Sequence, residues 1–377
     1  MEEIKMVDLK GLMNRIKPEI DEAIDRVLSS ERFIGGEEVQ EFAKELGGVI
    51  SEEEVFVIPC ANGTDALQIA LMAMGIGHGD EVITPNFTFI STVEVVSMLG
   101  ATPVLVDVYE DTFNIDCEAV ENAITENTKA IVPVHLFGQC ADMGKLMSIS
   151  KKHNIPLIED TAQSLLSVYC NEKGLSGTSG LFGSFGTTSF FPSKNLGCLG
   201  DGGAVITLDE TLAKKAKQIA NHGGLVKYEH DVIGMNSRLD SLQAAILRVK
   251  LPHLAGYISK RQEAACRYDE LLEDVEGVET PVRSDSSTHV FHQYTLRITN
   301  GMRDEVARGL LEFGIPTGVY YPKGIHEHKA FKGLGYKKGD FPISEKLSKN
   351  VLSLPMHTEL SREQQIYIVE SLVKCIS

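Results

Sequence analysis

The chain has 377 residues, of which 43% are hydrophobic and 24% are charged, the balance of an ordinary globular protein. The formal net charge of −17 at pH 7 argues against a nucleic acid or a membrane as partner, because nucleic acids and anionic membranes are bound by basic surfaces. No apolar run approaches the roughly 18 residues of a membrane span. The N-terminus, MEEIKMVDLKG, lacks the apolar segment of a signal peptide, so we expect a cytoplasmic protein.

The cysteines and histidines form no metal-binding pattern. Seven cysteines are scattered without a Cys-x-x-Cys pair, as is typical of reduced, mostly buried thiols. Eleven histidines show neither an HExxH motif nor a Cys/His spacing. We therefore expect no metal site.

The first half of the chain predicts a layered α/β fold. Helical spacing of apolar residues marks 17–29 and 39–46, and the glycine turn between them is either a helix boundary or a ligand loop. Further expected helices are 65–74, 88–99, 117–123 and 142–153, and expected strands are 55–59, 82–85, 103–108, 130–135 and 156–160. Short apolar strands that alternate with helices are typical of a mainly parallel sheet with helices on both faces. Ligands of such sheets bind beyond the carboxyl ends of the strands.

The second half predicts a change of architecture. Expected elements are strands at 187–191, 204–208 and 292–298, helices at 209–221 and 303–313, a β-like segment at 317–321 and a C-terminal helix. A long connector between Leu239 and Leu272 is kinked at Pro252. Ser361 and Gln364 form a capping box for the last helix. We expect a large domain at 1–250 and a small α+β domain at 251–377.

Lys194 lies in a glycine-rich segment, TSFFPSKNLGCLGDGGAV, and no other Lys or Arg occurs between Lys173 and Lys214. Glycine lets a backbone approach a ligand closely and adopt positive φ angles. A surface hairpin with a solvated lysine is the ordinary alternative. A lone cation in apolar surroundings is instead typical of a Schiff-base lysine, because desolvation lowers its pKa and frees the amine as a nucleophile.

Three other segments supply groups that could act with this lysine. The sequence Asn62-Gly63-Thr64-Asp65 opens a helix after a strand, where N–H groups bind an anion or where Asn62 or Thr64 simply caps the helix. Asp160 ends an expected strand, either as a cap or as a buried charge. Phe89 belongs to the core or stacks on a ring, and the Ser189 hydroxyl can donate to an anion. Proteins that use pyridoxal 5′-phosphate need four such groups: a phosphate site, a side chain that stacks on the ring, a carboxylate for the ring nitrogen and a lysine.

Six segments resemble motifs of the DegT/StrS-type nucleotide-sugar aminotransferases, namely CANGTDAL, ITPNFTF, IEDTAQS, TSFFPSKNLGCLGDGGA, GMNSRLDSLQAAIL and LPMH. They follow one another in the family's order over essentially the whole chain. The resemblance implies the aspartate-aminotransferase fold (pyridoxal-phosphate fold type I). This is an α/β fold with a mainly parallel central sheet, helices on both faces and a smaller C-terminal α+β domain. It also implies pyridoxal 5′-phosphate as the cofactor and L-glutamate as the amino donor.

The resemblance further implies roles for individual residues. These are Lys194 for the imine with the cofactor, Asp160 for the pyridine nitrogen, Gln163 for the phenolic oxygen, Phe89 for stacking, and Gly63, Thr64 and Ser189 for the phosphate. Asn236, in GMNSRLD, matches a residue that reaches the phosphate of the neighbouring subunit's cofactor. A homodimer with shared active sites is therefore expected, with an inactive isolated monomer.

Within this family, the chain looks most similar to enzymes that aminate UDP-2-acetamido-2-deoxy-3-oxo-glucuronic acid for bacterial surface polysaccharide such as O-antigen. Arg238 could bind an acidic or phosphorylated sugar, and the alternative is that it forms a salt bridge at the start of a helix. Tyr320 and Tyr321 are further expected substrate residues. Tyr320 departs from the family pattern, which has histidine before the Tyr-Pro pair, so the specificity of the subgroup stays open there.

The expected reaction consists of two half-reactions on one lysine, in which 2-oxoglutarate leaves before the keto sugar is aminated. Alternative substrates are 4-oxo-6-deoxy nucleotide sugars. A related sugar dehydratase would have histidine in place of Lys194. A dinucleotide-dependent oxidoreductase would need its glycines at a strand-to-helix turn, whereas Gly197–Gly203 precedes a strand. A catalytically silent sensor on the same fold is the remaining alternative.

Overall fold

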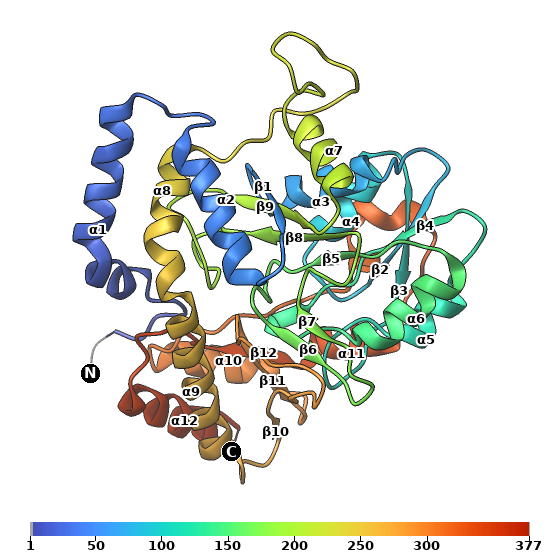
Figure 1. Cartoon of the computed structure of the whole chain (residues 1–377). Helices are drawn as coiled ribbons and strands as arrows, with labels where there is room; N and C mark the ends of the chain where they lie inside the picture. The colour runs from blue at the N-terminus through green and yellow to red at the C-terminus, as the bar shows by residue number, and fades with distance from the viewer. Residues whose placement is uncertain (1–2, 377) are drawn as a thin grey trace.

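The computed structural model describes residues 3–376 (Figure 1). Its central sheet has the strand order β3-β2-β4-β5-β8-β9-β1. These strands are β1 (Phe56–Cys60), β2 (Glu81–Pro85), β3 (Thr102–Val106), β4 (Thr128–Ile131), β5 (Ile158–Asp160), β8 (Phe185–Ser189) and β9 (Gly203–Thr207). Parallel bridges between Ile131 and Leu157 and between Val134 and Asp160 join β4 to β5. β9 is antiparallel to both of its neighbours, β8 and β1, and the other strand pairs are parallel, so the prediction of a mainly parallel sheet is confirmed.

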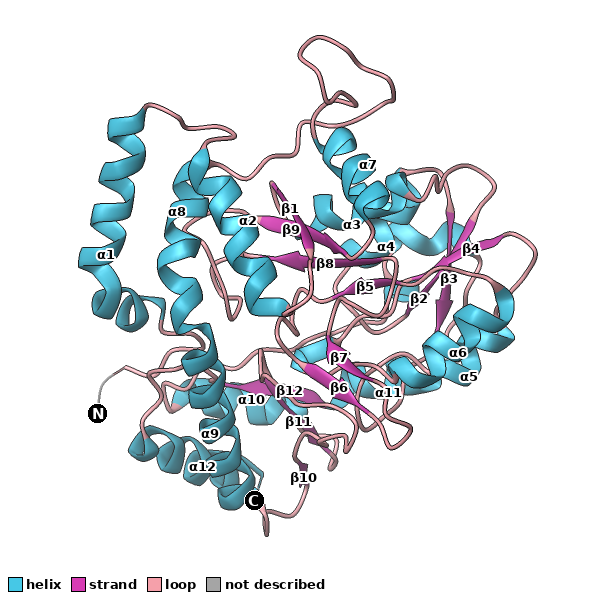
Figure 2. Cartoon of the chain, in the orientation of Figure 1, coloured by secondary structure: helices cyan, strands magenta, loops and turns pink. Residues whose placement is uncertain are grey.

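Helices cover both faces of this sheet (Figure 2). They are α2 (Glu37–Ile50), α3 (Gly63–Ala73), α4 (Ser91–Met98), α5 (Cys117–Asn122), α6 (Met143–His153) and α7 (Glu210–Ala220). Successive strand residues point to opposite faces. Val205 accordingly packs with α3, α4 and α7, while Ala204 and Ile206 pack with α2 on the other side. This alternation explains why the strands read as continuous apolar runs in the sequence.

The connector predicted between Leu239 and Leu272 consists of α8 (Ser241–Lys250), the 3-10 helix η2 (Leu251–His253) and α9 (Leu254–Leu272). The kink lies in η2, which contains Pro252. The helix α1 (Leu9–Ser30) packs beside α8 and begins well before the predicted start at residue 17. Its N-cap is Asp8, whose side chain accepts a hydrogen bond from the Gly11 N–H.

The C-terminal part forms a second core around a small antiparallel sheet. Its elements are β10 (Val278–Glu279), β11 (Tyr294–Ile298), β12 (Val351–Leu354), α10 (Arg303–Glu312), α11 (Pro342–Asn350) and α12 (Arg362–Ile376). The capping box of α12 is confirmed, since Gln364 N–H donates to Ser361 Oγ at 3.1 Å and Ser361 N–H donates to Gln364 Oε1 at 3.0 Å. The remaining short elements are β6 (Val168–Cys170), β7 (Ser176–Thr178), η1 (Leu136–Gly138), η3 (Ile325–Glu327) and η4 (Lys329–Leu334). The division at residue 250 stays a prediction.

The β-like segment predicted at 317–321 is wrong. Pairing with β12 is limited to Gly318 and Ser353, which exchange backbone hydrogen bonds of 3.0 and 2.7 Å. The next residues do not continue the ladder, and Tyr320 and Tyr321 line a cavity. Within residues 3–376 there is no helix with the length and apolarity to span a bilayer. The same residues contain no cluster of three or more His, Cys, Asp or Glu side chains that could hold a metal ion.

Candidate active site

A cavity of about 810 Å³ lies beyond the carboxyl ends of β5 and β8, beside the N-terminus of α3. This is the position at which open α/β sheets bind their ligands, and the volume suits a small molecule. The predicted site residues that line it are Gly63, Thr64, Phe89, Asp160, Gln163, Ser189, Lys194, Tyr320 and Tyr321. Residues that are distant in the sequence thus share one cavity.

The anion-binding end of the cavity is formed by α3 and β8. Asn62 is the N-cap, since its Oδ1 accepts a hydrogen bond from Asp65 N–H at 2.8 Å. The capping alternative is therefore correct for Asn62, while Thr64 Oγ1 lies in the cavity and forms a 2.8 Å hydrogen bond with Ser91 Oγ. A Cβ atom on Gly63 would lie 2.6 Å from the Ser189 Cβ, so only glycine allows helix and strand to approach this closely. The first-turn N–H groups and two hydroxyls converge there, which is the donor set for a phosphate.

Asp160 has 6% of its surface exposed and is held by two hydrogen bonds. Thr92 Oγ1 donates to its Oδ2 at 2.8 Å, and Ala162 N–H donates to its Oδ1 at 3.1 Å. Both sequence interpretations therefore apply, because the carboxylate caps the next turn and is also a buried charge. A carboxylate fixed in this way can pair with a protonated ring nitrogen.

The residue before Asp160 fixes β5 from the opposite face of the sheet. Glu159 is fully buried and accepts a hydrogen bond of 2.9 Å from the His135 Nε2. His135 Nδ1 accepts from Ala141 N–H, so the imidazole carries its proton on Nε2. Glu159 also accepts hydrogen bonds from the backbone N–H groups of Gly180, Phe182 and Gly183, which belong to the segment that leads into β8. One carboxylate thereby ties the strand that carries Asp160 to the strand that ends at Ser189.

Lys194 follows β8 in a tight loop in which its own N–H donates to Phe191 O at 2.8 Å. Burial lowers the pKa of the Lys194 ammonium group to about 8, and the Asp160 charge partly opposes this shift. The lysine is thus the desolvated amine that the sequence predicted.

Glycine is required around Lys194 for a different reason from the expected positive φ angles and contact with a ligand. Gly197, Gly200, Gly202 and Gly203 do not adopt left-handed φ angles. A Cβ atom on Gly197 would lie 2.4 Å from Pro192 O, and one on Gly203 would lie 2.4 Å from the Asn62 carbonyl group. Gly197 and Gly203 are needed where one stretch of backbone touches another, whereas the neighbours of Gly200 and Gly202 are side chains, and positive φ plays no part at any of the four.

The opposite wall of the cavity consists of aromatic and amide side chains. Gln163 Oε1 accepts from Phe137 N–H at 2.8 Å, and its Nε2 donates to Tyr321 Oη at 3.2 Å. Phe89 is 55% exposed, with its ring centroid 6.3 Å from that of Tyr321, so its face is accessible from the cavity. Tyr320 packs over Gly318, where a Cβ atom would lie 2.7 Å from the tyrosine ring.

Asn236 and Arg238 do not line this cavity. Both are exposed in the segment between α7 and α8, and Arg238 forms no ion pair with any described residue. The alternative of a salt bridge at the helix start is therefore not realised in this chain. Their roles at a neighbouring subunit's site stay predictions.

Several residues that line the cavity were not predicted, and His292 is the most buried titratable one. Burial and the nearby Lys194 and Arg261 charges hold the pKa of His292 well below its usual range, so its imidazole is neutral. Its Nδ1 lacks a hydrogen-bond partner within residues 3–376, as does Thr88 Oγ1 on the same cavity. No local motif marks His292: the strand predicted at 292–298 begins only at Tyr294, and His292 lies in the bend that precedes β11.

Comparison with known proteins agrees with this geometry. A family model described as the DegT/DnrJ/EryC1/StrS aminotransferase family matches residues 14–373. A "pleiotropic regulatory protein" of Geobacillus stearothermophilus is 47% identical over 98% of both chains. The UDP-2-acetamido-2-deoxy-3-oxo-D-glucuronate aminotransferase of Pseudomonas aeruginosa is 45% identical over 95% of this chain and 96% of its own.

Two solved structures extend the likeness to the fold. The S. venezuelae DesV crystal structure, in complex with a ketimine intermediate, superimposes with a TM-score of 0.94 at 38% identity and covers 100% of this chain and 99% of its own. NtdA from Bacillus subtilis, with bound cofactor PMP, gives a TM-score of 0.89 at 32% identity and covers 100% of this chain and 86% of its own. The type I fold expected from the sequence is confirmed by these matches. The chain belongs to the DegT/DnrJ/EryC1/StrS aminotransferase family.

Proposed function

We propose that this aminotransferase transfers the amino group of L-glutamate to a 3-oxo nucleotide sugar, UDP-2-acetamido-2-deoxy-3-oxo-glucuronic acid. The observation that carries the proposal is the convergence of Lys194, Asp160 and the α3 N-terminus on one cavity of about 810 Å³. The relative from Pseudomonas aeruginosa, whose name specifies that substrate, supports the choice of sugar. The product would enter bacterial surface polysaccharide.

The cavity fits pyridoxal 5′-phosphate, the cofactor of this enzyme class. Its phosphate would be held by the first turn of α3 with Thr64 and Ser189, and its ring would lie against Phe89. The buried Asp160 carboxylate suits a pyridinium nitrogen, and Gln163 can donate to an oxygen on the ring. When bound, the cofactor supplies an electron sink that weakens the Cα–H bond of the amino donor.

Lys194 is the group of this chain that moves the proton. With a pKa lowered to about 8, a substantial fraction of its amine is neutral near physiological pH and can accept a proton at Nζ. The Asp160 carboxylate lies in the same cavity, near enough to act on the pKa of Lys194, and its orientation is set by Thr92 and Ala162. The protein thus supplies a base and an electrostatic anchor, each in a fixed position.

Tyr320, Tyr321 and Arg238 are the proposed sugar contacts. Both tyrosines line the cavity and come from the segment that follows α10. Arg238 would act from the neighbouring subunit, because it is exposed and outside the cavity in this chain. Arginine suits a uronate or diphosphate group because its fork of donors matches carboxylate and phosphate oxygens.

The same segment supports the proposed homodimer with shared sites. The stretch after α7 projects from the body of the molecule in Figure 1 and carries exposed apolar side chains, namely Leu225 (54% exposed), Val226 (60%), Tyr228 (83%) and Ile233 (86%). Exposed apolar groups in one segment are typical of a protein interface. Asn236 follows directly and would reach the phosphate of the partner's cofactor.

A silent sensor is the second candidate, favoured by the name of the Geobacillus stearothermophilus relative. Lys194, Asp160 and Ser189 all line the cavity, and a sensor without chemistry would not need a lysine desolvated in this way. We therefore prefer the enzyme.

The test is a substrate panel with the purified, cofactor-loaded protein. L-Glutamate is added alone to follow the half-reaction by cofactor absorbance, and then with 3-oxo and 4-oxo UDP- and dTDP-sugars to follow the product mass. We expect 2-oxoglutarate formation and amination of the 3-oxo uronate. Consumption of 4-oxo sugars alone would contradict the assigned sugar, and absence of the glutamate half-reaction would favour the sensor.

A further inference from the structure

The connector between the two cores carries two buried cations that the chemistry described above does not use. Lys250, at the end of α8, is 2% exposed, and Arg261, in α9, is 4% exposed. Neither forms an ion pair with any residue between 3 and 376. Their side chains donate hydrogen bonds to backbone carbonyl groups instead, so both hold segments of the main chain in place.

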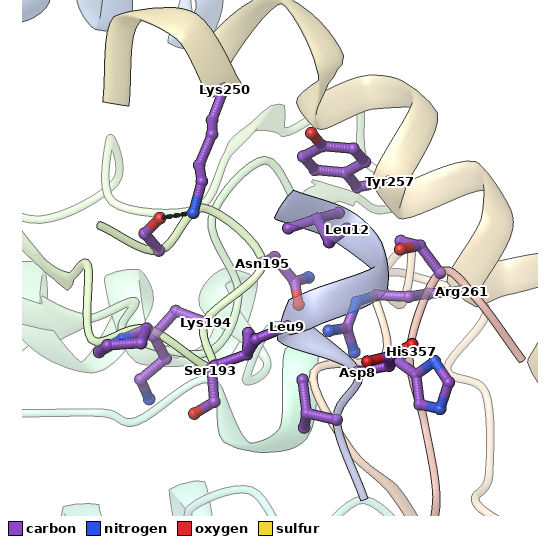
Figure 3. A pocket seen from close by; sticks show the side chains of 14 residues that line it. Asp8, Leu9, Leu12, Ser193, Lys194, Asn195, Lys250, Tyr257, Arg261 and His357 are labelled. Carbon is purple, nitrogen blue, oxygen red and sulfur yellow. Dashed lines mark hydrogen bonds between the residues drawn. The ribbon is translucent and has the colours of Figure 1, made fainter. Parts of the chain in front are cut away.

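Lys250 holds the base of the loop that carries Lys194. Its Nζ donates to Gly197 O at 2.6 Å, the hydrogen bond drawn as a dashed line in Figure 3. The loop is closed on itself at this point, because Cys198 N–H donates to Phe190 O at 2.8 Å and a Cβ atom on Gly197 would lie 2.4 Å from Pro192 O. Moving the Gly197 carbonyl would therefore move the whole loop, including Lys194.

Arg261 holds the wall that faces Lys194. Its Nη1 donates to the carbonyls of Phe291, His292 and Met356 at 3.0, 3.3 and 3.1 Å. His292 lines the active-site cavity, and its N–H donates to Phe137 O at 2.9 Å. The backbone of His292 is thus fixed on both sides, one of them by the connector.

A hydrogen bond joins the Lys194 loop directly to the segment that contains His292. Asn195, next to Lys194, donates from Nδ2 to Val290 O at 3.1 Å. Between loop, wall and connector lies a second cavity of about 20 Å³, lined by Lys194, Asn195, Lys250 and Arg261 (Figure 3). This volume holds about one water molecule and no substrate. Asn195 Oδ1 and Arg261 Nε lack protein partners among the described residues, which is the situation that an ordered water resolves.

These two cations are poor choices for stability alone. A buried ammonium or guanidinium group loses its hydration. A protein with an apolar side chain of the same size at that position is therefore often equally stable or more stable. We propose that Lys250 and Arg261 are positioning residues, which hold the Lys194 loop and the His292 wall in register across the two cores. The proposal rests on transamination at Lys194 and does not depend on the identity of the sugar.

The test replaces Lys250 by methionine, which has similar length and no charge. The matched control is Lys260→Met, on the exposed face of α9. For K250M we expect kcat of the glutamate half-reaction to fall roughly ten- to a hundredfold, with KM nearly unchanged, because misplacement affects the reacting geometry. We also expect the pH midpoint of the bound cofactor's visible absorbance to shift, because that absorbance reports the surroundings of Lys194. The melting temperature should not fall, and K260M should match the unaltered protein.

Two results would overturn the proposal. One is a K250M protein whose absorbance midpoint and kcat match those of K260M. The other is a loss of activity that only follows a lowered melting temperature. If K250M does not fold, Lys250→Gln and Lys260→Gln are compared in the same way, since the glutamine side chain is polar but uncharged and shorter than lysine, so kcat of K250Q should fall relative to K260Q while the melting temperature is retained. Failure of the unaltered protein to react with glutamate would contradict the proposed donor, and the absorbance titration would still test the positioning role.

Discussion

In the proposed transamination, Lys194 acts as a desolvated amine and Asp160 as a fixed carboxylate. Burial lowers the pKa of the lysine to about 8, and the carboxylate limits that shift. Asp160 is oriented by a threonine hydroxyl and a backbone N–H, so its position does not depend on a ligand. The charge pattern of the site therefore exists in the protein itself, which is the form of preorganisation that lowers reaction barriers.

Replacing Lys194 by alanine should remove the proton-transferring base. We expect kcat of the glutamate half-reaction to fall by at least about 10³-fold, the upper part of the range for loss of a general base. Stopped-flow absorbance of the bound cofactor measures this. Lys173→Ala is the control, because Lys173 is exposed on a distant turn and should have no effect. A K194A protein with near-normal turnover would show that another group is the base.

The lowered pKa of Lys194 predicts a pH dependence for cofactor uptake. Only the neutral amine bonds the aldehyde, so the rate of covalent capture by cofactor-free protein should rise with pH and level off above about 8. Since the Asp160 charge raises the pKa of Lys194, Asp160→Asn should move the midpoint to lower pH. Visible absorbance after mixing at each pH gives the profile. A midpoint near the ordinary lysine value of 10.5, or an upward shift in D160N, would contradict the electrostatic account.

At the scale of elements, the site depends on three close approaches. The first turn of α3 touches the end of β8, the loop after β8 closes on itself, and β9 passes against the turn before α3. Gly63, Gly197 and Gly203 stand at these contacts. The sheet delivers Asp160 and Ser189 to the same edge because β5 and β8 are parallel neighbours.

Gly63→Ala should separate α3 from β8. The new Cβ would lie 2.6 Å from the Ser189 Cβ and 3.2 Å from its Cα, so the helix terminus must shift. Overpacking of this kind costs about 1–3 kcal/mol, which corresponds to cofactor binding that is weaker by about 5- to 160-fold if the strain acts at the phosphate site. Equilibrium titration of the cofactor measures the change. Gly48→Ala is the control, since nothing lies within 4 Å of that position; equal affinities in the two variants would argue against the phosphate site.

At the scale of the whole molecule, the active-site cavity lies where the two cores meet. Lys194 comes from the first core, while His292, Tyr320 and Tyr321 come from the second half of the chain. The connector packs against both and holds the two walls. Asn236 and Arg238 remain outside, which is consistent with the proposed use of these residues by a partner subunit.

Mixing two inactive variants tests the shared site. Lys194→Ala removes the base of its own subunit, and Asn236→Asp would place a negative charge against the partner's phosphate. After subunit exchange, a mixed dimer holds one intact site, so about a quarter of all sites should regain activity. The half-reaction rate before and after exchange is the measurement. If the mixture stays inactive although mixed dimers form, Asn236 does not act across the interface.

The sequence by itself determined the alternation of strands and helices, the capping box of α12 and the segments that meet at the cavity. These are local properties, because period, caps and glycine-rich turns are encoded within a few residues. It also indicated Lys194 and Asp160, since a lone lysine and a strand-ending carboxylate stand out from apolar neighbours.

The tertiary structure alone decided which residues complete the site. His292, Lys250 and Arg261 act through contacts with segments far away in the chain, and no local pattern distinguishes a buried cation from an exposed one. The segment 317–321 reads as a strand, yet it pairs only at Gly318, and its tyrosines line the cavity, which the sequence of the segment does not reveal. The glycines near Lys194 were visible in the sequence, but their partners were not. Which backbone segments approach each other closely depends on the packed fold. The need for glycine at these positions can therefore be understood only from the tertiary structure.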